Sequence, residues 1–261
     1  MFSNAPRCIY DRNQLAEVVC QFRFPELLTI EANLPVEFQE AIRGVFPQYS
    51  SRKEIPAPQF TGTPGQITLQ KQHPVTNHQF LSADGIWRVN LTSKFISLSC
   101  TRYTCWEDFA SMLDLPLVAI IKLYKPAWFE RVGLRYVNFV SRQELELVGT
   151  PFSQLFQPCY VGILSEEDIS ENSVIRSSLD TEVNIRGGCK VKLHAGPGLV
   201  RKGGKPDGEV KFVFDQDLYM PGKVPVSASV GALQTLHAQA DAIFRFAITD
   251  TLHDAMEPRN L

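Results

Sequence analysis

Residues 130–140, ERVGLRYVNFV, decide the fold class of this chain. Polar and apolar side chains alternate along this stretch, so that Leu134 and Tyr136 share one side of an extended strand while Arg131 and Arg135 share the other. A period of two is typical of a strand that buries one face and leaves the other polar. Antiparallel sheets commonly contain such strands. We therefore expect an α+β protein whose antiparallel sheet has one covered face and one open, polar face.

Further strands follow from the same alternation and from turn-forming residues. Residues 15–24, LAEVVCQFRF, alternate in the same way. Two pairs that tolerate the positive φ of a type I′ turn, Asp84-Gly85 and Gly187-Gly188, favour hairpins. Prolines and glycines indicate a surface loop at 50–65 and a mobile hairpin tip at 196–208. The remaining strands are expected at 95–100 and at about 174–186, 189–195 and 209–215.

Three helices complete the predicted elements. A short amphipathic helix begins at Pro35 and ends before Pro47. A second helix begins at Thr104, whose spacing from Glu107 fits a capping box, and Pro116 is expected to kink or split it. The third is a long C-terminal helix over about 229–256, with an apolar stripe along one side.

The order of the predicted elements repeats along the chain. A strand, a helix, a meander of strands and a long helix occur twice. We therefore expect two similar halves, residues 1–128 and 129–261, each a curved antiparallel sheet gripping a long helix, within one compact unit. An ancient duplication would explain this similarity, and chance repetition in a strand-rich sequence is the alternative that stays open.

Composition and charge exclude several classes of protein. The 261 residues carry 26 Lys and Arg against 28 Asp and Glu, a formal net charge of −2, which argues against a general nucleic-acid binder. The longest apolar run, 115–123, is interrupted by Lys122 and is too short to span a membrane. No signal-peptide pattern opens the sequence and the six cysteines form no Cys-x-x-Cys pair, so we expect a cytoplasmic protein with reduced thiols and no membrane association.

Four segments together resemble a known family: 17–24 (EVVCQFRF), 105–109 (CWEDF), 130–140, and 233–252 (LQTLHAQADAIFRFAITDTL). They are similar to a sporadically distributed family of uncharacterised bacterial proteins of about 250 residues, and the resemblance covers nearly the whole chain. The chain departs from the family pattern at Cys105, where a glycine is expected. The resemblance implies a bacterial origin and a shared fold, and it brings no established activity. The patchy distribution of the family suggests mobile or defence gene clusters.

Patterns for phosphate or metal binding are weak. Residues 198–205 resemble a phosphate-binding loop, but Pro206 stands where Ser or Thr would bind Mg²⁺. A zinc site would need four ligands, and the candidates are Cys100, Cys105, His73 and His78. Buried free thiols and surface imidazoles are the favoured interpretation of these four residues. We expect neither a metal nor a cofactor.

Two catalytic arrangements stay open as alternatives. Asp180 and Glu182 on one strand, with Glu209 and Lys211 on a later strand, match the pattern of a Mg²⁺-dependent nuclease, although a solvated sheet face explains them equally simply. On the last helix, His237 could act as a general base with Asp241 one turn away, although a histidine at the edge of the core is the favoured interpretation. A small-ligand pocket under the sheet is a further alternative.

Basic residues alternate onto the open face of the predicted sheet, and they make it a candidate surface for an anion or a protein partner. The candidate binding residues are Arg23, Arg131, Arg135, Arg186, Lys190, Lys192 and Lys211. The alternative is that these cations pair with carboxylates on neighbouring strands. In particular, we expect Arg23 and Arg135 to converge at the centre of the molecule, where they pair with Glu17 and Glu130, the favoured interpretation, or receive an anionic group from a partner.

These observations favour a non-enzymatic binding or interaction protein. No catalytic pattern in the sequence is stronger than its structural explanation, and the polar sheet face is the positive sign. We expect a protein partner, encoded by a neighbouring gene in a bacterial defence or toxin-type operon. The alternative is a Mg²⁺-dependent nuclease or a phosphate-ligand enzyme that uses the same sheet face, with a nucleic-acid partner less favoured.

Overall fold

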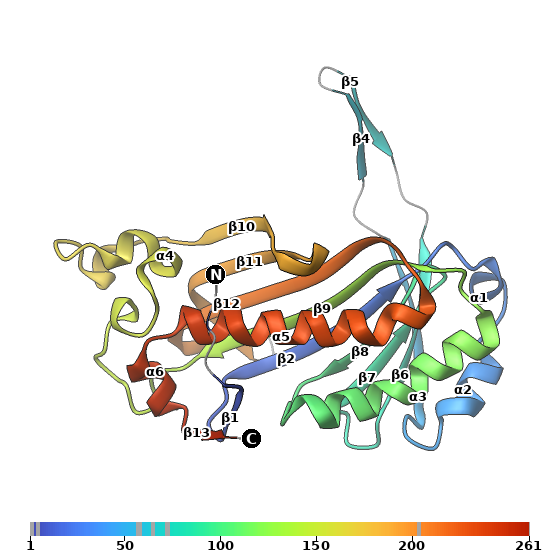
Figure 1. The fold of residues 1–261 in the computed structure, drawn as a ribbon, viewed down its shortest axis with the longest axis horizontal. Coiled ribbons are helices and arrows are strands. Elements are labelled where there is room, and N and C mark those ends of the chain that lie inside the picture. Colours follow the sequence, from blue (N-terminus) through green and yellow to red (C-terminus); the bar gives the residue numbers. More distant parts are fainter. Residues whose placement is uncertain are drawn as a thin grey trace.

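One antiparallel sheet of nine strands forms the centre of the protein in the computed structural model, which describes residues 3, 6–55, 59–63, 66–70, 74–202 and 205–260 (Figure 1). The strands are β2 (Leu15–Arg23), β3 (Gln48–Glu54), β6 (Val75–Leu81), β7 (Trp87–Leu91), β8 (Phe95–Cys100), β9 (Phe129–Val140), β10 (Leu179–Asn184), β11 (Lys190–Lys202) and β12 (Lys205–Val224). Their order across the sheet is β10-β11-β12-β9-β2-β8-β7-β6-β3, and every neighbouring pair is antiparallel. The predicted α+β class is confirmed.

The predicted strand at 130–140 is β9, which lies in the middle of the sheet between β2 and β12. Leu134 lies opposite Cys20 of β2 and Leu218 of β12, and all three side chains are fully buried. Arg135, the next residue of β9, is exposed on the other face. The alternation therefore assigns the two faces of this strand correctly, because a pleated strand directs successive side chains to opposite sides.

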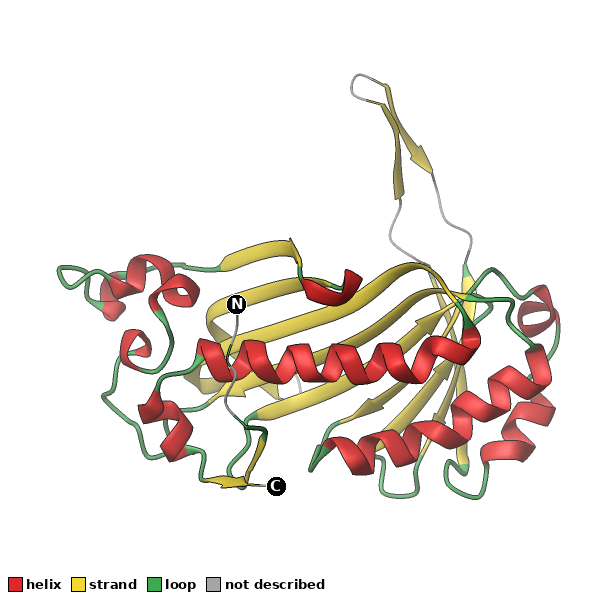
Figure 2. Ribbon diagram, viewed as in Figure 1, coloured by secondary structure: helices red, strands yellow, loops and turns green. Residues whose placement is uncertain are grey.

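Six α-helices lie among the described residues: α1 (Leu28–Ala32), α2 (Val36–Ile42), α3 (Trp106–Tyr124), α4 (Pro158–Val161), α5 (Ser229–Ala247) and α6 (Asp250–Ala255). The two long helices, α3 and α5, lie on the same side of the sheet (Figure 2). α5 packs on β9 and β12, and α3 packs on β8 and α2. Burial of apolar side chains between these helices and the sheet forms one contiguous core, in which aromatic pairs such as Phe22–Phe129 and Phe156–Phe212 lie 4.9 and 4.1 Å apart.

Two short antiparallel pairs lie outside the main sheet. β1 (Cys8–Tyr10) pairs with β13 (Pro258–Asn260), so the first and last strands of the chain lie side by side. β4 (Gln59–Thr63) pairs with β5 (Gln66–Gln70) in a hairpin that extends away from the sheet in Figure 1.

Two predicted loops contain more strand than expected. The expected surface loop at 50–65 contains most of β3 as well as β4, and its residues 56–58 and 64–65 lie outside the described residues. The expected hairpin at 196–208 is present, but its strands extend further than predicted, with pairing that continues past a register shift between Leu199 and Arg201; residues 203–204 lie outside the described residues. Gly196, Pro197 and Gly198 do not end β11, because they lie beyond its pairing with β10, where one side of the strand is an edge.

Local details of the helices and turns also differ from expectation. No capping box forms at α3: the N-cap is Cys105 without a side-chain bond, and Thr104 instead donates to Asp108 over 2.6 Å. Pro116 does not split α3, which is assigned as one helix. The expected helix over 229–256 is two helices, α5 and α6, separated where Ile248 forms a β-bridge. In the Asp84-Gly85 pair only the glycine has positive φ, at 71°, so the turn is not type I′.

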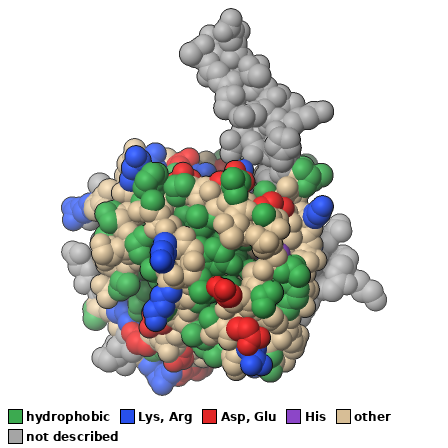
Figure 3. All heavy atoms as spheres, turned by 90° about the vertical axis from the view of Figure 1, so that its right-hand side faces the viewer, with side chains coloured by type: hydrophobic (Ala, Val, Ile, Leu, Met, Phe, Trp, Pro, Cys, Tyr) green, Lys and Arg blue, Asp and Glu red, His purple; other side chains and the backbone are tan. Residues whose placement is uncertain are grey.

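The described helices include none that is long and apolar enough to cross a membrane. The end of the molecule formed by α1, α2 and the end of α3 carries several exposed apolar side chains, and Figure 3 shows hydrophobic atoms over much of this end. The exposed apolar residues of these helices and their flanking turns are Leu28, Leu34, Val36, Val45, Leu115, Val118 and Leu123.

Candidate functional site

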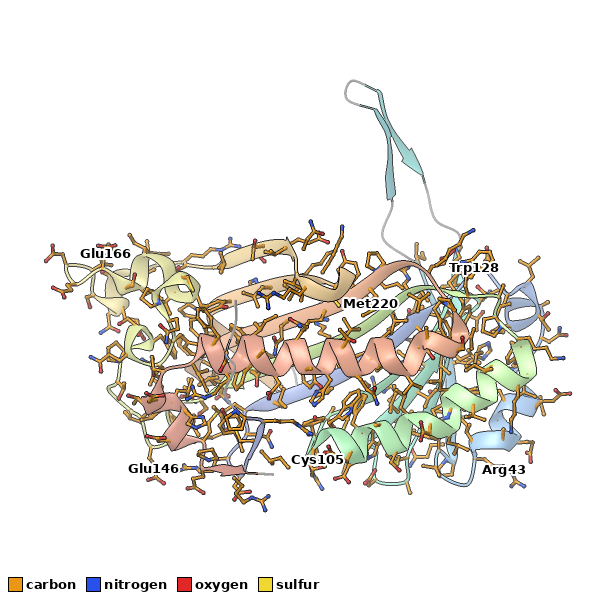
Figure 4. All side chains as sticks on the ribbon, in the orientation of Figure 1. Arg43, Cys105, Trp128, Glu146, Glu166 and Met220 are labelled. Atoms are coloured by element: carbon orange, nitrogen blue, oxygen red, sulfur yellow. The ribbon has the colours of Figure 1, made fainter. Side chains whose placement is uncertain are left out.

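A cavity of about 90 Å³ lies between the main sheet and α5. β9 and β12 contribute its floor, α5 contributes one wall, and the residues just before α3 together with β1 contribute the opposite side. Cys105, labelled in Figure 4 at the start of α3, marks this side of the cavity. Because a single water molecule needs roughly 10–15 Å³ of such space, the cavity has room for a small organic molecule.

Two amide side chains interrupt the apolar face of the sheet at the cavity floor. Asn138 lies on the buried side of β9, and Gln216 lies between Phe214 and Leu218 on the buried side of β12; they are 3% and 2% exposed. Asn138 Nδ2 donates to the Phe214 carbonyl over 3.3 Å. The Gln216 amide makes no hydrogen bond within the part of the chain that the structure describes, and its Oε1 is fully buried. A buried polar group without a partner costs about 1–3 kcal/mol, so a hydrogen bond to the Gln216 amide from a molecule bound in the cavity would stabilise the fold.

Tyr103, Tyr136 and His237 lie in contact along one side of the cavity. The Tyr136 hydroxyl lies 2.9 Å from His237 Nδ1, and the Tyr103 and Tyr136 rings meet edge to face with centroids 5.9 Å apart. The imidazole also stacks on Trp106, with ring centroids 4.5 Å apart and 8° between the planes. Burial lowers the pKa of His237 to about 4, and it raises the pKa of Tyr136. The imidazole is therefore neutral at pH 7, while its buried Nε2 has no hydrogen-bond partner among the described residues.

Charged groups lie at one end of the cavity. Asp241, one turn after His237 on α5, lines the cavity, and burial raises the pKa of its carboxyl. Arg7 also lines the cavity, but its guanidinium donates to both carboxylate oxygens of Glu107, over 2.7 and 3.1 Å. Asp241 has no ion pair within 4 Å in the described part of the chain. The predicted pairing of His237 with Asp241 is not formed, because His237 bonds to Tyr136 instead.

The N-terminal strand closes the remaining side of the cavity. Ile9 of β1, with Leu15, Phe244 and Met256, supplies apolar surface. β1 is held in place by its ladder to β13 and by a hydrogen bond of 2.8 Å between the Tyr10 hydroxyl and Nδ1 of the α6 histidine, His253. An apolar cavity with a few converging polar groups is the usual form of a small-molecule site.

The open face of the sheet carries rows of alternating charge. In one row Glu182, Lys192, Asp217 and Arg135 lie opposite one another on β10, β11, β12 and β9. Diagonal ion pairs join different rows: Arg135 bonds to Asp215 of the next row at 2.8 Å, and Arg131 reaches past the row of Gly133 and Tyr219 to Asp217 at 2.6 and 2.8 Å. Figure 2 shows the helices on the opposite side of the sheet.

Arg131 lies flat against the sheet. Its guanidinium is 4.5 Å from the centre of the Tyr219 ring, and a Cβ at position 133 would collide with it, so Gly133 is needed for this close approach. The interaction with Asp217 and the stacking on Tyr219 hold Arg131 in place, as the alternative interpretation of the basic residues predicts.

The other predicted binding residues are dispersed. Lys190 and Lys192 lie on the open face of β11, and Lys192 faces the Tyr219 ring at 6.0 Å. Lys211 lies near the start of β12, 2.9 Å from Asp207 and 3.6 Å from Glu144. Arg186 lies in the turn between β10 and β11, which leans toward α5, because a Cβ at position 187 would touch Thr235.

The expected convergence of Arg23 and Arg135 is wrong. Arg23 of β2 lies opposite Arg131 of β9, and Arg135 lies opposite Val19. Arg23 and Arg135 are therefore offset by four residues, roughly 13 Å along the strand direction. The partner of Arg135 is Asp215 rather than Glu17 or Glu130: Glu17 lies on the same face of β2, opposite Val137, but forms no ion pair with Arg135 within 4 Å.

The structure does not bring the nuclease residues together. Asp180 lies in the same row of the sheet as Asp215, with β11 between them. Asp215 is six residues from Glu209 along β12, so Asp180 and Glu209 are separated by roughly 20 Å along the strand direction. The Glu209 carboxylate is 9% exposed and accepts hydrogen bonds from Ser141 Oγ and Gln143 N over 2.6 and 3.0 Å, so it already serves the fold. Of the residues that resemble a phosphate loop, 198–202 belong to β11 and Lys205 begins β12, while 203–204 lie outside the described residues.

Within the described ranges, no group of three or more His, Cys, Asp or Glu side chains is placed to hold a metal ion. Of the zinc candidates, Cys100 is buried on β8, Cys105 begins α3, and His78 is hydrogen-bonded to the Tyr49 hydroxyl at 3.0 Å. His73 lies outside the described residues.

Two residues of the cavity floor carry a sequence signal that belongs to no known motif. Asn138 and Gln216 are the polar exceptions on strands whose neighbours of the same parity are apolar. A polar residue on the buried face of a strand must find a partner or bind something. Tyr103 and Trp106 carry no comparable signal, because they reach His237 only through the folding of segments more than a hundred residues apart.

No family model matches this sequence, and no curated protein matches it. What the cavity can bind therefore follows from its own geometry and chemistry.

Proposed function

We propose that the protein is a non-enzymatic binding protein that holds a small organic molecule in the cavity between the sheet and α5. The observation that carries this proposal is the Gln216 amide, which is buried at the cavity floor without a hydrogen bond. A ligand that hydrogen-bonds to Gln216 would remove this cost, and the apolar walls would bury the rest of the molecule. A protein that bound nothing here could avoid the cost of a buried amide with an apolar residue at position 216.

The groups around the cavity support binding more than catalysis. His237 is the residue best suited to proton transfer there, but its Nδ1 is bonded to Tyr136, and its pKa of about 4 makes it a weak base. The stacking on Trp106 holds the imidazole in one orientation, which suits recognition of a ligand.

The strand order supports the proposal that the fold consists of two related halves. We infer that residues 1–128 and 129–261 form these halves, each gripping one long helix, α3 or α5. In each, the first strand is central (β2 or β9), the chain then moves to the edge strand (β3 or β10), and a meander returns to the centre before the helix. β2 and β9 pair with each other at the junction, so the cavity takes residues from both proposed halves.

The open sheet face is a second candidate site, for a protein partner encoded by a neighbouring gene in a defence or toxin-type operon. The observation in its favour is the row of alternating charges on β9–β12, which would suit a protein surface of mixed charge. It is less suited to phosphate, because Arg131 and Arg135 are already paired with carboxylates. We expect no cleavage of DNA or RNA with Mg²⁺; cleavage that is abolished by Lys211→Ala without unfolding would establish the nuclease instead.

A fragment screen tests the proposed binding function directly. The purified protein is titrated with neutral, cationic and anionic fragments while amide chemical shifts are recorded by NMR. Ala240 is 2% exposed and lines the cavity, so Ala240→Phe fills the site, whereas Ala238→Phe places the same side chain on the exposed side of α5. We expect fragments to bind wild type and Ala238→Phe but not Ala240→Phe. The proposal would be refuted if no fragment bound wild type, or if every fragment that bound wild type also bound Ala240→Phe.

A further inference from the structure

We propose that the ligand of this cavity is a small organic amine in its protonated form, an ammonium group on an apolar body. This inference rests on the proposed binding function and adds to it the chemical class of the ligand. It is carried by the charge that the cavity leaves unbalanced, by the hydrogen-bonding groups that it leaves free, and by its neutral histidine and aromatic walls.

The first step concerns charge. Asp241 is the one carboxylate among the described residues that line the cavity, and Arg7 is the one guanidinium. Arg7 is engaged by both oxygens of Glu107, and it acts on Asp241 only as a longer-range attraction without an ion pair within 4 Å. Asp241 has no ion-pair partner within 4 Å in the described part of the chain, although it is partly buried. A cation bound in the cavity would balance this carboxylate, whereas an anion would add to it.

The second step concerns hydrogen bonds. An ammonium group has three donors and no acceptor. Two oxygen acceptors come from residues that line the cavity, the Asp241 carboxylate and Asn138 Oδ1, and Gln216 would supply a third if its side-chain amide turned the buried Oε1 toward the ligand. The Asn138 amide is oriented by the bond from its Nδ2 to the Phe214 carbonyl, which leaves Oδ1 as its free atom. Gln216 Oε1 is buried and lacks any donor among the described residues.

The third step concerns what surrounds the proposed cation. His237 is neutral at pH 7, so it does not repel a positive ligand, and its position is fixed by Tyr136 and Trp106. The rings of Tyr103 and Phe244 also line the cavity. Aromatic faces attract cations and cover apolar groups equally well. The small volume limits the ligand to one short amine.

Three molecules of similar shape and different charge test the class of ligand: benzylamine, benzyl alcohol and benzoate. Their dissociation constants are measured at pH 7 by NMR titration of wild type, Asp241→Asn and Asp254→Asn. Asp254 is an exposed carboxylate on α6 and is the matched control. We expect benzylamine to bind wild type about tenfold or more tightly than benzyl alcohol, because a charged hydrogen bond adds roughly 1.5–3 kcal/mol. Asp241→Asn should remove this preference, and Asp254→Asn should preserve it.

The possible outcomes separate this inference from the binding function. If benzyl alcohol or benzoate binds as tightly as benzylamine, or if Asp241→Asn leaves benzylamine binding unchanged, the ammonium class is wrong while a ligand-binding cavity stands. If none of the three molecules binds at a site that Ala240→Phe blocks, two claims are contradicted. The ligand class is then wrong, and the cavity does not bind fragments of this size. Preference for benzylamine that depends on Asp241 and is blocked by Ala240→Phe supports both.

Discussion

His237 shows how the surroundings of one residue set its chemistry. A histidine in water is half protonated near pH 6.5, but this one stacks on Trp106 and bonds to Tyr136 at the edge of a cavity. Burial removes the water that would solvate an imidazolium and lowers the pKa to about 4. The same two neighbours make His237 a fixed, neutral wall of the site.

This shift in pKa predicts a pH dependence of stability. Between pH 6.5 and pH 4 the unfolded chain binds a proton on His237 that the folded protein does not bind. The free energy of unfolding should therefore fall as pH falls through this window, by roughly 3 kcal/mol in total, and this contribution should stop changing below pH 4. Urea denaturation at pH 7, 5.5 and 4 measures the slope.

The variant His237→Phe provides the control, because it keeps an aromatic ring against Trp106 and cannot titrate. Asp241 contributes in the opposite direction, since its raised pKa makes the folded protein bind a proton first as pH falls. The difference in slope between wild type and His237→Phe isolates His237. Equal slopes for the two proteins would show that the imidazole is not desolvated.

Arg135 and Arg23 should differ in their contribution to stability. Arg135→Ala would leave the Asp215 carboxylate, 15% exposed, without its ion pair. We expect a loss on the order of 1 kcal/mol, which lowers the melting temperature by about 2–4 °C. Arg23 is exposed and has no ion pair within 4 Å among the described residues, so Arg23→Ala should change stability by less than about 0.5 kcal/mol. Melting temperatures within 1 °C of wild type for both variants would contradict a structural role for Arg135 and favour the open face as a binding surface.

At the scale of elements, β9 carries two surfaces at once. Its buried side contributes Leu134 to the core and Asn138 to the cavity floor, and its open side contributes Arg131 and Arg135 to the charged rows. A strand with a period of two separates such roles without any additional structure. The cavity and the charged face are therefore positioned by the same backbone.

Substitutions on the two sides of β9 should differ sharply in cost. Leu134 is fully buried between β2 and β12, so Leu134→Ala should lower the free energy of unfolding by about 2–5 kcal/mol. Val137 lies on the open side and is half-buried, so Val137→Ala should cost less than about 1 kcal/mol. Denaturant unfolding of both variants measures the difference, and equal costs would mean that the faces of β9 are assigned wrongly.

The elements that sequence patterns predicted well are those whose signal is local. Alternation located β2 and β9, because the faces of a strand are set by its own residues. The capping box failed because Glu107 binds Arg7, a residue a hundred positions away. The break between α5 and α6 was missed because a bridge to Phe156 creates it, and no local pattern encodes that contact.

At the scale of the whole molecule, the sheet brings distant segments into one site. β1 and the residues before α3 meet β9, β12 and α5 around the cavity, and the pairing of β2 with β9 holds the two sides together. Sequence patterns indicated most of the strands, whereas the polar exceptions on two of them gained meaning only from the fold. They could not indicate that Tyr103, Gln216 and His237 meet, because strand order and helix placement depend on packing across the whole chain.

The central claim is that this cavity is kept open for a ligand at the expense of stability. Equilibrium unfolding of Gln216→Met in the absence of ligand tests it most directly, since methionine matches the shape of glutamine and removes the buried amide. If the amide has no partner in the free protein, the variant should be more stable than wild type by about 1–2 kcal/mol. A variant that is less stable than wild type by a similar amount would show that Gln216 serves the fold, and the claim would be wrong.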